Sequence, residues 1–142
     1  MTNEQLENIQ TDSESFEFIL INFANADMVG HTGNLQAAIR AWQVVDQCLG
    51  RIVDVVENLD GVVLVTGDHG NAEEMINSDG QPNTEHSTNP VPFIVIGRQF
   101  VGQTNNLLSG ILADVAPTVL YLLGLKKPSS MLGRNLLTWS NT

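Results

Sequence analysis

The chain has 142 residues, of which 42% are hydrophobic, and this is enough for one globular domain with its own core. Six lysine and arginine residues against sixteen acidic residues give a formal net charge of −10. This charge excludes nucleic acid as the expected partner, because binding a polyanion requires a basic surface. The one cysteine, Cys48, excludes an internal disulfide and fits a reducing compartment.

Nothing in the sequence predicts a membrane span or a secretory signal. No segment reaches the roughly 20 apolar residues that cross a bilayer. The longest candidate, residues 111–125, is interrupted by Asp114 and Pro117. Residues 1–15 are polar and acidic, unlike the apolar core of a signal peptide. We therefore expect a cytoplasmic protein without a membrane partner.

The first half of the chain predicts a buried strand followed by a long helix. Residues 16–24 are almost continuously apolar, which is typical of a strand in a parallel sheet covered on both faces. Asn34 is the predicted N-cap of the helix, because its side chain can accept a hydrogen bond from a free backbone amide. Apolar residues then recur at steps of three and four and predict one buried helical face: Leu35, Ala38, Trp42, Val45, Leu49, Ile52, Val56 and Leu59.

The second half alternates strands and helices in the same way. Strands are predicted at residues 62–66 and 93–97, with a short helix at 71–77 and a polar, turn-rich stretch at 78–89. A second helix is predicted at 109–123, with a late start or a kink at Pro117 and with Gly124 as its C-cap. The tail from residue 128 is predicted to be irregular. The pattern indicates an α/β fold with a mostly parallel sheet flanked by helices.

The three histidines all lie in short polar segments that contain a carboxylate, at residues 25–33, 65–71 and 84–90. Two of these segments directly follow predicted strands, where ligands bind in open α/β sheets. Neutral imidazole and carboxylate together suit divalent metals such as zinc and manganese. The candidate metal ligands are Asp27, His31, Asp68, His69 and His86.

Each motif by itself also has a purely structural interpretation. Asp27 could cap a turn, the Asp68-His69 pair could lie in a solvated turn, and His86 could be a surface histidine. Gly30 argues against a continuous helix between Asp27 and His31, so we expect a loop that aims both side chains at one ion. Adjacent residues of an extended segment point in different directions, so Asp68 and His69 suit two neighbouring ions better than one.

Together the motifs favour a metal site, although the ligands are too few for two complete sites. Asp27, His31 and His86 could form one site, which leaves Asp68 and His69 for the other. The six basic residues form no cluster of arginines of the kind that usually meets a phosphorylated substrate.

Several stretches resemble the cofactor-independent phosphoglycerate mutases. They are residues 25–34 (NADMVGHTGN), 68–73 (DHGNAE) and 86–93 (HSTNPVPF). Residues 112–119 (LADVAPTV) resemble the C-terminal helix of the same family. The related phosphopentomutases share the loop at Asp68 but differ around the other two histidines, so the resemblance is specific. It runs from about residue 16 to residue 137.

The resemblance implies an alkaline-phosphatase-like α/β fold and an isomerase that acts in glycolysis. Such an enzyme interconverts 3-phosphoglycerate and 2-phosphoglycerate through a phosphoserine intermediate, with two Mn²⁺ ions (Zn²⁺ or Co²⁺ in some relatives). Carried over by motif, Asp27, His31 and His86 would hold one ion, and Asp68 and His69 would hold the other.

The family's remaining parts have no match in this chain. The nucleophilic serine and a further aspartate ligand come from an N-terminal segment of a longer protein, and most substrate-binding arginines from a second domain. No serine here lies in the nucleophile's motif, so no catalytic residue is assigned. The resemblance thus implies a fragment with an incomplete sheet: a polar lead at 1–15, the C-terminal portion of the phosphatase domain at 16–137, and a tail at 138–142.

The partners implied are phosphoglycerate, the missing segment and the second domain. An open sheet edge would also favour self-association of the fragment. Three functions stay open: part of a phosphoglycerate mutase, part of another metal-dependent phosphatase or phosphomutase of the superfamily, or a non-catalytic metal-binding module. We expect the isolated chain to be inactive, because covalent phosphoryl transfer needs a nucleophile.

Overall fold

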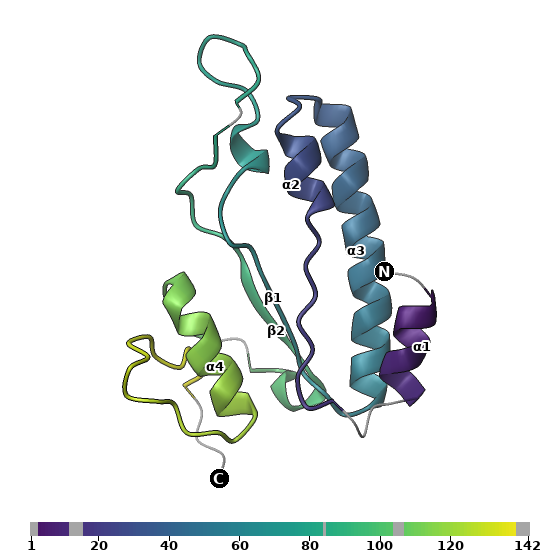
Figure 1. Cartoon of the computed structure of the whole chain (residues 1–142), viewed down its shortest axis with the longest axis vertical. Helices are drawn as coiled ribbons and strands as arrows, with labels where there is room; N and C mark the ends of the chain where they lie inside the picture. The colour runs from purple at the N-terminus through teal and green to yellow at the C-terminus, as the bar shows by residue number, and fades with distance from the viewer. Residues whose placement is uncertain (1–2, 12–15, 84, 104–106, 139–142) are drawn as a thin grey trace. The chain divides into compact units, whose positions relative to one another are not determined.

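The computed structural model describes residues 3–11, 16–83, 85–103 and 107–138, and it divides into two compact units, residues 1–98 and 99–142. The predicted boundaries at residues 15/16 and 137/138 stay a prediction. None of the helices in the described ranges is long and apolar enough to cross a membrane. The elements in chain order (Figure 1) are α1 (Asn3–Thr11), α2 (Asn25–Gly30), α3 (Leu35–Asn58), β1 (Val63–Thr66), β2 (Phe93–Ile96) and α4 (Val115–Leu122), with 3-10 turns at Ala72–Glu74, Arg98–Phe100 and Leu112–Asp114.

The long helix α3 confirms the predicted periodicity and its cap. The Asn34 side chain accepts a hydrogen bond from the backbone N–H of Ala37 at 3.0 Å, which satisfies one of the free amides of the first turn. Ala38 and Ile52 of the predicted apolar face are buried, whereas Trp42 of the same face is half exposed. The sequence therefore located the helix, but the described chain covers only part of its apolar face.

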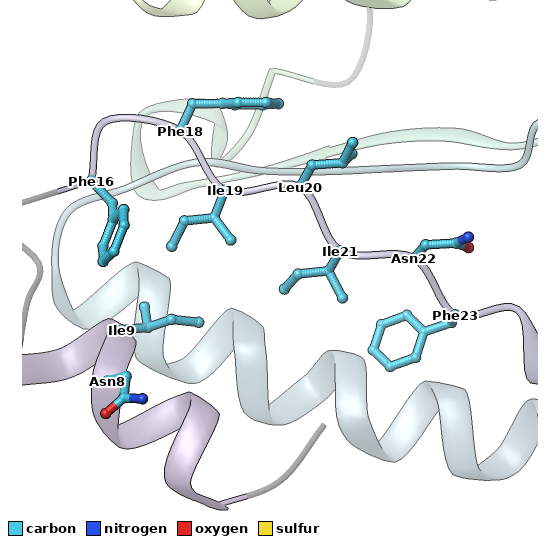
Figure 2. Close-up of a pocket in the computed structure, with 9 residues that line it drawn as sticks. All are labelled: Asn8, Ile9, Phe16, Phe18, Ile19, Leu20, Ile21, Asn22 and Phe23. Carbon is cyan, nitrogen blue, oxygen red and sulfur yellow. The ribbon is translucent and has the colours of Figure 1, made fainter.

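The predicted strand at residues 16–24 does not form. Residues 16–23 form an extended segment with a bend at Glu17, but their backbone makes no hydrogen bond to any other described residue. Figure 2 shows their side chains alternating: Ile21 and Phe23 point towards α3, and Leu20 points away from it. Ile21 and Phe23 pack against a cluster centred on Ile52 and Val55, whereas Leu20 is 83% exposed. A strand needs a hydrogen-bonding neighbour, and among the described residues this segment makes side-chain contacts without backbone pairing.

The sheet also corrects the predicted topology. The described strands β1 and β2 pair in antiparallel register, from Val63 opposite Ile96 to Thr66 opposite Phe93. A parallel pair would need a crossover connection, usually a helix. Between β1 and β2 the described residues form the 3-10 turn Ala72–Glu74 and a loop that folds back on itself, visible in teal in Figure 1. The two strands are therefore joined as a long hairpin.

The C-terminal unit is organised around α4. Helix α4 begins at Val115, so Pro117 lies in its first turn, where a missing amide hydrogen costs little; the predicted late start is confirmed. Gly124 has φ 68° and follows the helix end, and the backbone N–H of Leu125 donates to the carbonyl of Leu120 at 2.8 Å. These features confirm Gly124 as the residue that terminates the helix.

Two buried polar residues hold the tail onto α4. The carboxylate of Asp114 accepts backbone N–H groups from Arg134 at 2.8 Å and Ile111 at 2.9 Å. These donors, that of Arg134 first, hold the pKa of Asp114 below its ordinary value. The hydroxyl of Thr118 accepts from the backbone N–H of Leu136 at 3.0 Å. The tail is irregular as predicted over its described residues, and residues 139–142 lie outside them.

Candidate metal centre

The first ligand pair is carried by helix α2, which the sequence did not predict. Residues Asn25–Gly30 form a short helix, and the backbone N–H of His31 donates to the carbonyl of Asp27 at 3.2 Å. The predicted loop is therefore wrong. Gly30 is tolerated because it ends the helix, and Gly33, with φ 67°, lies beyond it. The helix places Asp27 and His31, four positions apart, on one face.

Three of the predicted ligand atoms lie close together. Asp27 Oδ1 is 3.3 Å from His31 Nε2 and 3.5 Å from His86 Nε2, and the two imidazole nitrogens are 3.2 Å apart. Ligand bonds of about 2.0–2.1 Å to a tetrahedral ion place the ligand atoms about 3.3–3.4 Å from one another. The donor set and its spacing therefore fit a single divalent ion.

The third histidine, His69, lies against the same group. Its ring stacks on that of His86, with centroids 3.5 Å apart and planes 11° apart. Asp27, His69 and His86 each offer a ligand atom within 4.8 Å of the others. The fold thus brings all three histidines to one place, from segments far apart in the sequence.

Asp68 lies outside that group and faces solvent. Its side chain is 90% exposed, and its Oδ1 is 3.6 Å from His69 Nε2. Among the described residues, the ionic partner of Asp68 is His69. The assignment of Asp68 and His69 to a second ion stays a prediction.

Two further residues, Asn71 and Glu73, connect the segments that carry the predicted ligands. The sequence analysis did not select them. The side-chain amide of Asn71 donates to Asp27 Oδ1 at 2.8 Å and lies 3.4 Å from His31 Nε2. Glu73 accepts the backbone N–H of Asn71 at 3.0 Å. The only available signal was their place in the same short motif as His69.

Glu73 also holds the segment that carries His86. Its carboxylate accepts hydrogen bonds from the hydroxyl of Ser87 and from the side-chain amide of Asn89, the latter at 3.1 Å. These hydrogen bonds, that of Ser87 above all, lower the pKa of Glu73 from its ordinary value of 4.5 to about 2. The carboxylate is therefore charged at neutral pH and joins two ligand-bearing loops.

A backbone bridge brings those two loops together. Gly70 and Ser87 exchange backbone hydrogen bonds of 3.3 Å and 2.9 Å. A Cβ atom at Gly70 would collide with the Glu73 carboxylate and the Ser87 hydroxyl, so a larger residue would have to displace these two side chains. The close approach required at Gly70 is thus a condition for placing His69 beside His86.

Comparison with known proteins identifies a family to which the chain is similar. A model described as the metalloenzyme superfamily matches residues 1–127. A 2,3-bisphosphoglycerate-independent phosphoglycerate mutase of Desulforudis audaxviator is 54% identical over 125 residues, which cover 88% of this chain and 24% of the relative. The Clostridium acetobutylicum protein of the same name is 48% identical over 137 residues, which cover 96% and 26%.

The fold of the chain is also similar to that of a solved phosphoglycerate mutase. The phosphoglycerate mutase of Leishmania mexicana, crystallised at low cobalt concentration, matches with a TM-score of 0.72 and 31% identity. The match covers 95% of this chain and 28% of that one. The chain therefore spans about a quarter of the length of the relatives that it matches.

Proposed function

Because the chain belongs to the metalloenzyme superfamily, we propose that it is the metal-binding part of a 2,3-bisphosphoglycerate-independent phosphoglycerate mutase. Such an enzyme interconverts 3-phosphoglycerate and 2-phosphoglycerate through a phosphoserine, with the serine supplied by another part of the longer protein. The observation that carries this proposal is the spacing of Asp27 Oδ1, His31 Nε2 and His86 Nε2, 3.2–3.5 Å from one another. The similarity to phosphoglycerate mutases supports the substrate class.

These three residues would hold one Mn²⁺ ion, or Zn²⁺ or Co²⁺ in its place. One carboxylate oxygen and two imidazole nitrogens are donors that all three metals accept. When bound, such an ion supplies positive charge to phosphoryl oxygens. The three side chains are partly exposed, so an anionic ligand from solvent can reach them.

Asp68 and His69 would bind the second ion. Asp68 Oδ1 and His69 Nε2 are 3.6 Å apart, and the carboxylate of Asp68 faces solvent. An ion there would still have open positions, because two donors do not complete a coordination shell. This suits a site shared with residues from another part of the longer protein.

By itself the 142-residue chain would bind metal without mutase turnover. Ser87 is the serine next to a proposed ligand, and its hydroxyl donates to the carboxylate of Glu73. It joins two loops, and the carboxylate that accepts its hydrogen bond, with a pKa lowered to about 2, is too weak a base to activate a nucleophilic serine. Metal binding without catalysis is therefore the second function to test.

The decisive experiment is a calorimetric titration of the metal-free chain with Mn²⁺ and Zn²⁺. We expect binding that His86→Ala abolishes, because this variant removes one of three donors. The exposed turn residue Asp79 gives a matched control, and Asp79→Ala should bind as the unaltered chain does. Binding that survives in His86→Ala would contradict the proposed ligand set.

The substrate is tested in the complete enzyme. Asp27→Ala there should abolish the interconversion of the phosphoglycerates, and near-normal turnover would contradict the proposal. A panel of phosphorylated sugars and glycerates separates a phosphoglycerate mutase from another phosphomutase of the superfamily. Preference for a phosphopentose would favour the latter.

A further inference from the structure

We propose that Asn71 is a positioning residue that holds Asp27 and His31 in the geometry that binds the ion. This inference rests on the proposed metal site and adds a residue that does not itself bind metal. The side-chain Nδ2 of Asn71 donates to Asp27 Oδ1 at 2.8 Å and lies 3.4 Å from His31 Nε2. One amide thus contacts two of the three proposed ligands.

The hydrogen bond to Asp27 is compatible with metal binding. A carboxylate oxygen has two lone pairs, so Oδ1 can accept from Asn71 and still donate to an ion. An oriented carboxylate loses less conformational entropy when the ion binds. Partners of this kind typically change metal affinity by about 10–100-fold when they are removed.

Gly30 shows that the fold makes room for this amide. A Cβ atom built on Gly30 would collide with Asn71 Oδ1 and lie 3.0 Å from Asn71 Cγ. Gly30 is buried in the last position of α2, between Asp27 and His31. The close approach of α2 to Asn71 therefore depends on the missing side chain at this position.

Glu73 in turn fixes Asn71. Its Oε2 accepts the backbone N–H of Asn71 at 3.0 Å, and its Oε1 accepts the hydroxyl of Ser87, the neighbour of His86. The contacts run without a break from α2 through Asn71 and Glu73 to the loop of His86. Hydrogen bonds that are present without a metal ion thus connect Asp27 to the loop that carries His86.

The test is a double-mutant cycle on metal affinity, measured by calorimetric titration of the chain with Mn²⁺ and with Zn²⁺. Asn71→Ala should weaken binding by about 10–100-fold. Gly30→Ala should weaken it similarly by displacing the amide. The double variant should bind no more weakly than either single variant, because both changes remove the same contact.

Two matched controls separate positioning from general destabilisation. Gly50 lies in α3 with open space at its Cβ position, and Asn58 is an exposed residue at the end of α3. Gly50→Ala and Asn58→Ala should leave the affinity unchanged. Circular dichroism confirms that each variant is folded. Unchanged affinity in Asn71→Ala, or losses that multiply in the double variant, would overturn the inference.

A metal-free measurement distinguishes this failure from failure of the proposed site. In ¹⁵N-labelled chain, Asp27→Ala should shift the side-chain NH₂ resonances of Asn71, whereas Asp79→Ala should not. No shift would overturn the inference even if metal binds. A shift in a chain that binds neither metal would refute the metal site and the positioning role, and leave only a structural hydrogen bond.

Discussion

The loops of the candidate metal centre and the extended segment at 16–23 belong to the same unit but are stabilised in opposite ways. The loops are polar, and their own side chains satisfy their hydrogen-bonding groups. Glu73 alone accepts three hydrogen bonds, from Asn71, Ser87 and Asn89. The extended segment is apolar, and its backbone is unpaired among the described residues.

The difference shows which part of the molecule depends on neighbours. Side-chain hydrogen bonds between nearby loops are local, so they form wherever the loops meet. A buried strand needs backbone partners and cover on both faces, which only further segments can supply. Figure 2 shows a pocket lined by Ile9 and by side chains from both faces of the segment, with Leu20 pointing away from the helices. The hydrogen-bonded loops of the candidate metal centre are therefore the more self-sufficient feature.

The largest expected effect tests the two faces of the extended segment. Phe23 packs against the cluster at Ile52, so Phe23→Ala should lower the free energy of unfolding by about 2 kcal/mol, less than the ~3–5 kcal/mol of a fully buried phenylalanine. Leu20 is 83% exposed, and Leu20→Ala should change it by less than about 0.5 kcal/mol. Urea unfolding measures both, and equal losses would show that both faces are covered.

A smaller effect concerns the loops and pH. The pKa of Glu73 is lowered to about 2 in the folded chain, so its contribution to stability is complete above its ordinary pKa of 4.5. That contribution is lost as the pH falls from 4.5 towards 2. Glu73→Gln should therefore lose less stability over this range than the unaltered chain does.

Urea unfolding at a series of pH values checks this difference. The exposed neighbour Glu74 gives a matched control, since Glu74→Gln should keep the pH dependence of the unaltered chain. Parallel curves for Glu73→Gln and the unaltered chain would show that the carboxylate does not hold the loops together.

The last prediction concerns self-association of the chain, and its expected effect on stability is the smallest. The unpaired backbone and exposed apolar side chains at 16–23 favour pairing with a second copy of the chain. Leu20→Lys places a charge on that face and should shift analytical ultracentrifugation profiles towards the monomer. Stability should change by less than about 0.5 kcal/mol. Association unaffected by Leu20→Lys would place any self-contact elsewhere.

The candidate site could be predicted largely from residue types, because imidazole and carboxylate groups are themselves suited to divalent metals. His31, His69 and His86 were selected as ligands from the carboxylates beside them, and the structure brings all three together. Asn71 and Glu73 could not be selected, since amides and carboxylates are common in loops. Their role depends on which loops meet.

Helices whose periodicity and caps are local properties could be located from the amino-acid sequence. The N-cap at Asn34 and the terminating Gly124 are both found as predicted, because each depends on a few neighbouring residues. Local propensity misled at α2, where Gly30 indicated a loop. There the glycine ends a helix and leaves room for Asn71.

The strand pairing and the spacing of the predicted ligands could be read only from the folded chain. An apolar run predicts burial but not its partner, so the sequence could not distinguish the antiparallel pair β1–β2 from a parallel one. It also could not show that none of the described strands pairs with residues 16–23. Strand pairing and ligand spacing depend on segments far apart in the chain, and a local sequence pattern does not show how close these segments lie in the folded chain.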